Sequence, residues 1–300
     1  MHSRRLLIPT VAAAAAAVLL LSGCVDNTTG GDEPTTGSSA PTIAVDEAAA
    51  ALLPAEIADS GKLVVGTDAA YPPNEYKDAD GNPIGWDVDL VEALGAKLGL
   101  EVEYEIASFD KIIPSITGGT MDMGMSSFTD NAERQEQVDF VDYYSAGILW
   151  AAPAGKTVDP DDACGLKVAV QATTYEHTDE LPAKSQACTD AGKPAIEITP
   201  FDTQDAAANA VVLGQADAMS ADSPVTGYAI KLSGGKLEAA GGIVDAQPYG
   251  WPVPKGSSLA SALQAALKHL MQTGEYRQIA TKWGVEMGVI DKPVINGALR

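Results

Sequence analysis

Apolar and polar positions follow two different periods along the chain from about residue 62 onward. Short apolar or alternating segments predict strands, and segments with an apolar residue at every third or fourth position predict amphipathic helices. The predicted strands are residues 63–66, 101–106, 121–125, 167–171, 196–200 and 216–221, and the predicted helices are residues 87–99, 110–116 and 205–213. Such alternation is typical of an α/β fold with a mixed or parallel sheet covered on both faces.

The helix predicted at residues 87–99 shows the pattern most clearly. Its apolar residues fall on one face, and Asp87 can cap its N-terminus. The apolar residues of this face are Leu90, Val91, Leu94 and Leu98. Strands and helices form two similar series, which suggests two α/β lobes, and about 230 residues also favours two domains over one. An alanine-rich segment at 45–58 predicts a short helix leading into the folded part.

The N-terminal residues have the pattern of an export signal. Arg4 and Arg5 precede an apolar segment at 6–21, which is shorter than the about 20 residues of a membrane-spanning helix. The following Leu-Ser-Gly-Cys resembles bacterial lipoprotein signals, which implies removal of residues 1–23 and a diacylglycerol on Cys24. An uncleaved membrane helix is the alternative. The two arginines also resemble a twin-arginine signal, without deciding the export route.

Residues 25 to about 45 are rich in Gly, Thr, Ser, Pro and acidic residues, and contain too few apolar residues to fold. We interpret the segment 24–61 as a lipid anchor and flexible tether. A chain of this kind reaches roughly 25 to 30 Å on average. It would hold a folded domain near the extracytoplasmic face of the bacterial cell membrane.

The chain is strongly acidic, with 19 Lys and Arg against 41 Asp and Glu and a net charge of −22. Loss of the leader would remove two more positive charges. Nucleic acids and anionic membrane surfaces are therefore excluded as electrostatic partners. The sequence also contains no glycine-rich phosphate loop, no His-Glu-x-x-His and no Gly-x-Ser-x-Gly. We therefore expect no cofactor and none of the common enzyme classes.

Two cysteines remain when the cysteine of the leader is assigned to the lipid. Cys164 and Cys188 would then lie in a compartment where thiols oxidise, and we predict that they form a disulfide. Closing a loop of this length would stabilise the fold by about 3 kcal/mol. A metal site is the alternative, but neither His177 nor His269 lies at ligand spacing from either cysteine. We expect no metal.

A set of motifs runs in order through residues 62–288. The first is GTDAAYPPNEY at 66–76, followed by GWDVDL at 85–90. Further motifs lie at 109–114, 121–134, 137–140, 170–174, 216–218, 222–224, 249–256, 274–276 and 283–284. This ordered set resembles the family 3 extracellular solute-binding proteins, the amino-acid receptors of bacterial ABC importers. One such motif would be weak, but the ordered set is specific.

The resemblance implies a two-lobed periplasmic-binding-protein fold of type II, in which two crossing strands join two α/β lobes. The expected bounds are 62–147 and 250–290 for lobe 1, 153–244 for lobe 2, hinges near 148–152 and 245–249, and a C-terminal tail at 291–300. It also implies a free amino acid as ligand and an ABC transporter permease as membrane partner. We expect a monomer. Which amino acid is bound is not predicted beyond a polar or cationic side chain.

The resemblance also implies the residues that hold the ligand. A zwitterion must exchange its water for groups of opposite charge. Arg134 matches the family's carboxylate-binding arginine, whose planar guanidinium can donate two parallel hydrogen bonds, and Asp222 matches the ammonium-binding position. Ser127, Thr129 and, at a helix start, Thr173 would donate further to the carboxylate. The alternatives are a solvated charge for Arg134 and capping or turn formation for Thr173 and Asp222.

Tyr71 and Phe109 match positions where the family has aromatic walls, although Phe109 in the core is a competing interpretation. Asp68, at the end of the first strand, could reach the ligand's side chain. The family commonly has an aromatic residue where this chain has Asn74. Asp68 and Asn74, with or without Glu75, would make a polar pocket floor, which favours an amide or a cationic ligand. A purely structural role for Glu75 is equally open.

Two other functions fit the same fold. A dehydratase or hydrolase would need a general acid or base in the cleft, and Glu75 and Asp68 are the candidates. A ligand sensor for a signalling partner would require a further membrane span or a kinase. Since Arg134 and Asp222 already form the pair that an amino acid requires, we expect a receptor and no enzyme.

Overall fold

The computed structural model describes residues 43–298, which belong to one folded unit. The predicted signal peptide, the lipidation site Cys24 and the tether as far as residue 42 lie outside the described residues. Within the described range, no helix is long and apolar enough to cross a membrane.

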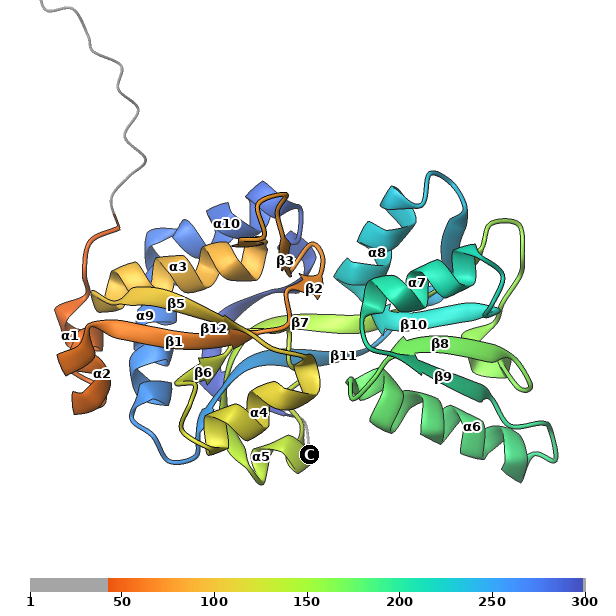
Figure 1. The fold of residues 1–300 in the computed structure, drawn as a ribbon, viewed down its shortest axis with the longest axis horizontal. Helices are drawn as coiled ribbons and strands as arrows, with labels where there is room; N and C mark the ends of the chain where they lie inside the picture. Colours follow the sequence, from red (N-terminus) through yellow and green to blue (C-terminus); the bar gives the residue numbers. More distant parts are fainter. Residues whose placement is uncertain (1–42, 299–300) are drawn as a thin grey trace, which may run out of the picture. The chain divides into compact units, whose positions relative to one another are not determined.

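Lobe 1 is built around a parallel sheet with the strand order β5-β1-β6. Its strands are β1 (Lys62–Thr67), β5 (Glu101–Ile106) and β6 (Met123–Gly124), and its helices are α3 (Trp86–Leu98), α4 (Phe109–Thr117), α5 (Ala132–Gln135), α9 (Leu259–Thr273) and α10 (Glu275–Trp283). Figure 1 shows α3 on one face of this sheet and α4 on the other. A small antiparallel sheet follows β1 and consists of β2 (Ala70–Tyr71), β3 (Glu75–Lys77) and β4 (Pro83–Ile84).

Lobe 2 is built around a mixed sheet with the strand order β11-β7-β10-β8-β9. Its strands are β7 (Val138–Pro153), β8 (Lys167–Gln171), β9 (Glu197–Phe201), β10 (Ala218–Asp222) and β11 (Leu237–Pro254). Its helices are η1 (Pro160–Asp162), η2 (Glu176–Glu180), α6 (Leu181–Asp190), α7 (Gln204–Val212) and α8 (Ser223–Leu232). In Figure 1, α7 and α8 lie on one side of this sheet and α6 on the other.

The two long strands β7 and β11 belong to both lobes and pair with each other in antiparallel register (Figure 1). In lobe 2, residues 148–151 of β7 also pair with β10. In lobe 1, β7 pairs with the C-terminal strand β12 (Val289–Ile295). The register of β11 against β7 shifts twice between Ala240 and Gln247, and again between Tyr249 and Gly250. The two-lobed α/β fold is thereby confirmed.

The elements predicted from the apolar pattern are all present, with ends shifted by one or two residues at most. The four apolar residues that the pattern placed on one face of α3 are buried in the core of lobe 1. Burial of a side chain of this size stabilises the fold by about 1.5 to 3 kcal/mol. The apolar periodicity of this helix therefore reports the packed face correctly.

The predicted cap of α3 is wrong. The residue before the helix is Gly85, at φ 142, and a Cβ there would lie 1.9 Å from the backbone oxygen of Asn74. Only glycine fits this approach. Asp87 is instead the second residue of the helix, and its side chain is buried. It accepts hydrogen bonds from Tyr143 Oη and Trp251 Nε1. Burial raises the pKa of Asp87 to about 7, against the effect of these two bonds.

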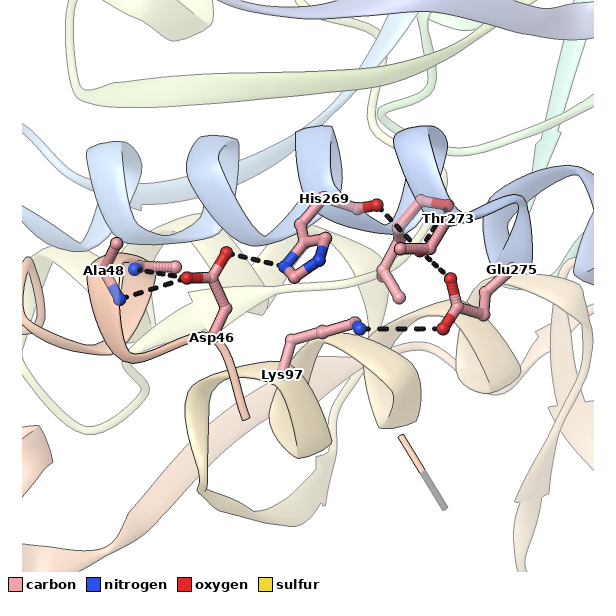
Figure 2. A network of polar contacts seen from close by, with 8 residues as sticks. Asp46, Ala48, Lys97, His269, Thr273 and Glu275 are labelled. Carbon is pink, nitrogen blue, oxygen red and sulfur yellow. Dashed lines mark hydrogen bonds and ion pairs between the residues drawn. The ribbon is translucent and has the colours of Figure 1, made fainter. Parts of the chain in front are cut away.

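The alanine-rich segment forms two helices instead of one, α1 (Glu47–Ala50) and α2 (Ala55–Ser60). Proline at position 54 separates them, because its ring disfavours a helical residue before it. Asp46 caps α1 through the N–H groups of Ala48 and Ala49, and its other oxygen lies 2.7 Å from His269 Nδ1 on α9 (Figure 2). Residues 47–60 of the predicted tether are therefore folded.

Polar contacts tie separate segments of lobe 1 to one another. Figure 2 also shows Lys97 of α3 beside Glu275, with 3.6 Å between Nζ and Oε1. At the C-terminus, the N–H groups of Gly297 and Ala298 donate to Asp142 and Asp130. The segment predicted as a tail at 291–300 thus contributes to β12 and to this contact as far as residue 298.

The predicted disulfide between Cys164 and Cys188 is confirmed, with 5.5 Å between the two Cα atoms. It ties α6 to the segment between η1 and β8, and both cysteines pack against the core of lobe 2. Among residues 43–298, no group of three or more His, Cys, Asp or Glu side chains has the arrangement of a metal site.

Candidate functional site

One pocket between the lobes contains every predicted ligand-binding residue except Thr173. Lobe 1 lines it with Asp68, Tyr71, Phe109, Ser126, Ser127, Thr129 and Arg134. Lobe 2 lines it with Gln171, Thr174, Tyr175, Glu176 and Asp222. Residues far apart in the sequence are therefore brought together at the ends of strands, where α/β proteins commonly bind ligands.

Arg134 is held in a fixed orientation on the lobe 1 side. It lies in the short helix α5, whose cap Asn131 accepts a hydrogen bond from the Arg134 N–H at 2.9 Å. Its guanidinium donates to the carbonyl oxygens of Thr129 at 2.8 Å and Thr173 at 3.0 Å, and lies 5.5 Å from the ring centre of Phe109. Burial lowers the pKa of Arg134 from its ordinary value. Arg134 is thus a half-buried cation held by two backbone carbonyl groups, which does not fit the alternative of a freely solvated helix charge.

Asp222 lies at the end of β10, at the cap position of α8, but its side chain makes no capping hydrogen bond. One carboxylate oxygen instead accepts a hydrogen bond from Tyr71 Oη at 2.8 Å, across the pocket. Burial raises the pKa of Asp222 to about 6, while the Tyr71 bond and the charge of Arg134 oppose the rise. The carboxylate is therefore directed to the pocket, as the resemblance implies.

Two further hydrogen bonds join the two lobes. Gln171 Nε2 donates to Asp68 Oδ2 at 2.9 Å, and the Arg134 guanidinium reaches the Thr173 carbonyl of lobe 2. Burial raises the pKa of Asp68, against the effect of the Gln171 bond. A ligand in this pocket would contact side chains of both lobes.

Ser127 and Thr129 both line the pocket beside Arg134. Ser127, at φ 51, accepts from Asn74 Nδ2 at 2.8 Å and donates to Glu75 Oε2 at 3.0 Å. Thr129 uses its carbonyl oxygen for Arg134. Their donation to a ligand carboxylate stays a prediction.

Thr173 lies outside the pocket. Its φ of 65 is unusual for a threonine, its hydroxyl donates to the carbonyl of Ala172 at 2.7 Å, and its N–H donates to His177 Nδ1. The next residue, Thr174, lines the pocket instead. The lobe 2 hydroxyl that faces the site is therefore one position later than expected.

Of the predicted polar floor, Asp68 lines the pocket, the prediction for Asn74 is wrong, and Glu75 has the structural role given as its alternative. Asn74 and Glu75 are both fully buried and neither lines the pocket. Asn74 Oδ1 accepts from Trp86 Nε1 at 2.7 Å, and its amide supports Ser127. Glu75 also bonds Ser127, and burial beside Asp87 raises its pKa well above the ordinary value. These two residues position Ser127 from behind, because a buried indole N–H and a buried hydroxyl both need partners.

Sequence reasoning missed five pocket residues, namely Ser126, Gln171, Thr174, Tyr175 and Glu176. Four of them belong to one segment, which runs from Gln171, the last residue of the buried strand β8, to Glu176, the first residue of η2. Polar residues directly after the carboxyl end of a buried strand were the available signal. Glu176 is the least expected of them, because it is an ionisable residue with only 2 % of its surface exposed.

Comparisons with known proteins agree with this geometry. The model of the bacterial extracellular solute-binding proteins, family 3, matches residues 63–286. The arginine-binding protein ArgT of Corynebacterium glutamicum is 43% identical over 248 residues, which are 82% of this chain and 82% of that protein.

Two solved structures are also similar to this chain. An ancestral arginine-binding protein bound to arginine has a TM-score of 0.68 and 33% identity, and the match covers 74% of this chain and 98% of that one. An ancestral amino acid-binding protein, described as a precursor of cyclohexadienyl dehydratase, has a TM-score of 0.66 and 34% identity over 76% of this chain and 97% of that one.

Proposed function

Because the chain belongs to the bacterial extracellular solute-binding proteins of family 3, we propose that it binds a free basic amino acid and delivers it to an ABC importer permease. L-Arginine is the first candidate. The observation that carries the proposal is that Arg134 and Asp222, a half-buried cation and a buried carboxylate from different lobes, line one pocket. A zwitterion requires this pair of charges.

In this proposal Arg134 binds the ligand's carboxylate, with Ser127 and Thr129 as further donors. The planar guanidinium suits two parallel charge-assisted hydrogen bonds. Asp222 binds the ammonium group. Since these groups come from both lobes, the ligand favours the closed arrangement through contacts that an open one would lack.

The charge of the pocket favours a basic side chain. Three acidic residues, Asp68, Glu176 and Asp222, face one basic residue, Arg134. A ligand with a neutral side chain would add no net charge, whereas arginine adds one positive charge. A buried carboxylate without a counter-charge is costly, so the basic ligand is preferred. We assign Asp68 to the side chain of the ligand, and the arginine-binding relatives support this choice.

The test is a thermal-shift panel of the twenty amino acids, followed by calorimetry on Arg134→Ala and Asp222→Ala. We expect stabilisation by arginine and loss of binding in both variants. The matched control is Arg277→Ala, because Arg277 is an exposed arginine paired with Asp291 on the surface. Unchanged affinity in both pocket variants would remove the site assignment, and turnover of a bound amino acid would favour an enzyme.

The location of the protein is a separate part of the proposal. Family membership and the sequence pattern before residue 24 support an extracytoplasmic receptor anchored through a diacylglycerol on Cys24. Fractionation of cells that express Cys24→Ser tests this. We expect the variant to leave the membrane fraction, and retention there would contradict lipid anchoring.

The hinge is also proposed. The lobe bounds 62–147 with 250–290 and 153–244 would be joined where β7 and β11 pass between the lobes. The shift of register between Ala240 and Gln247 supports a flexible point in β11, because irregular pairing interrupts the ladder. Small-angle scattering with and without arginine should show a smaller radius of gyration in the bound protein.

A further inference from the structure

Glu176 is a pocket residue to which the proposed function gives no specific role. It is the first residue of η2 and lines the same pocket as Arg134 and Asp222. Only 2 % of its surface is exposed, and its Oε1 atom has no hydrogen-bond partner among residues 43–298. A buried oxygen without a partner costs free energy unless a ligand supplies a donor.

The charged groups around Glu176 show which part of a ligand it faces. Asp222 is the charge with the largest effect on the pKa of Glu176, and Glu180 on the same helix acts in the same direction. Glu176 is in turn the largest charge acting on Arg134, and it also acts on the pKa of Tyr71, which donates to Asp222. Glu176 therefore lies near Arg134 and Asp222, and the bond from the Arg134 guanidinium to the Thr173 carbonyl holds the segment that carries Glu176 beside Arg134.

We propose that Glu176 binds the α-ammonium group of the ligand together with Asp222. This inference rests on the proposed function, since it assigns a second ammonium-binding carboxylate to the same pocket. An ammonium group has three N–H donors, so two carboxylates can accept from it at once. Tyr71 already donates to Asp222, and the free Oε1 of Glu176 is the acceptor that remains.

The second carboxylate couples binding to a proton. Burial, with the charge of Asp222 nearby, raises the pKa of Glu176 well above its ordinary value and so favours the protonated form. A protonated carboxyl group can still accept a hydrogen bond, but only the ionised form adds charge attraction to the ammonium group. Glu176 then gives its proton to the buffer as the ligand enters, and the negative charge that forms faces the positive charge that arrives.

The first experiment tests whether Glu176 contacts the α-ammonium group or the side chain of the ligand. L-Arginine and L-citrulline share the α-ammonium and α-carboxylate groups, but only arginine has a charged side chain. Glu176→Gln should weaken both ligands by a similar factor of about 10 to 100. Asp68→Asn should weaken arginine alone. A loss for arginine without a loss for citrulline would place Glu176 at the side chain and overturn the proposal, as would no loss for either ligand.

The matched control is Asp179→Asn. Asp179 lies on the same short helix and its charge also acts on Arg134, but it does not line the pocket. We expect a change in affinity of about twofold or less, because an accessible charge is screened by solvent. A loss of affinity as large as that of Glu176→Gln would show that the effect comes from the overall negative charge of the segment, and it would overturn the proposal.

The second experiment counts protons and needs arginine only. Calorimetry in phosphate and in Tris at pH 7, whose ionisation enthalpies differ, gives the number of protons exchanged on binding. We expect the wild type to release more protons on binding than Glu176→Gln does. If the wild type released no protons on binding, the proposal would be overturned, and this result does not depend on how well the variant folds. Equal proton release by both proteins would also overturn it. Failure of the wild type to bind any amino acid would instead remove the proposed function.

Discussion

The two sides of the pocket differ in how well their polar groups are satisfied. On the lobe 1 side, Arg134 is oriented by backbone carbonyl groups and a capping bond, and Ser127 is held by Asn74 and Glu75. On the lobe 2 side, Asp222 receives its hydrogen bond from Tyr71 of lobe 1, and Glu176, which lines the pocket, has a buried oxygen without a partner among the described residues. Glu75 of lobe 1 also has such an oxygen, but Glu75 does not line the pocket.

This difference indicates separate tasks for the lobes. Lobe 1 presents a preorganised surface for the ligand, which lowers the entropy cost of binding. Lobe 2 presents carboxyl groups that are stabilised most by the positive charge of a ligand. We therefore expect substitutions on the lobe 1 side to affect geometry and stability, and substitutions on the lobe 2 side to change the dependence on charge and pH.

The largest effect should come from removing the cation of lobe 1. Arg134→Met keeps much of the apolar stem but leaves the ligand carboxylate and the nearby acids without a counter-charge. We expect a loss of about 2 to 5 kcal/mol in arginine binding, measured by calorimetry. Arg277→Met, on the surface, serves as the control. A loss below tenfold would show that the carboxylate is bound elsewhere.

The second largest effect should come from removing the side chain that supports Ser127 on the lobe 1 side. Asn74→Leu removes the acceptor of Trp86 and the donor to Ser127, which leaves the buried indole N–H unsatisfied and Ser127 with its bond to Glu75 alone. The free energy of unfolding, from denaturant titration, should fall by about 1 to 3 kcal/mol. Asn82→Leu, at an exposed position, should be nearly neutral. If stability were unchanged but affinity fell, Asn74 would contact the ligand directly, contrary to its position.

The third prediction concerns pH and the lobe 2 side. The pKa of Asp222 is about 6, so below this pH the carboxyl group is protonated and no longer attracts the ammonium. The affinity for arginine should therefore decrease as the pH falls through 6, by about tenfold per unit for one group. Titrations between pH 7.5 and 5 measure the slope. A flat profile would mean that the ammonium is not bound by a titrating carboxylate of lobe 2.

The smallest effect distinguishes two neighbouring hydroxyl groups. Thr173→Ala should change arginine affinity by about twofold or less, because its hydroxyl bonds Ala172 outside the pocket. Thr174→Ala should cost more, about 1 kcal/mol, since Thr174 lines the pocket and its hydroxyl supports the segment before η2. The reverse order of the two losses would restore Thr173 as the lobe 2 donor.

The comparison of the sides also explains where sequence reasoning succeeded. Arg134 and Asp222 were identified by resemblance, and the structure places both in one pocket. Asn74 was misjudged because its polarity was read as exposure to the ligand, whereas its side chain is used by Trp86, a residue 12 positions away, and by Ser127, 53 positions away. Glu176 was missed because a glutamate after a strand is ordinarily a solvated residue.

The sequence by itself determined the local elements, the buried face of α3 and the pairing of Cys164 with Cys188, because periodicity and a small number of thiols restrict these choices. Only the tertiary structure decided which polar side chains face the pocket and which support it from behind. That choice depends on hydrogen-bond partners and burial supplied by distant segments, and a carboxyl group acquires its charge state only from the surroundings in which folding places it.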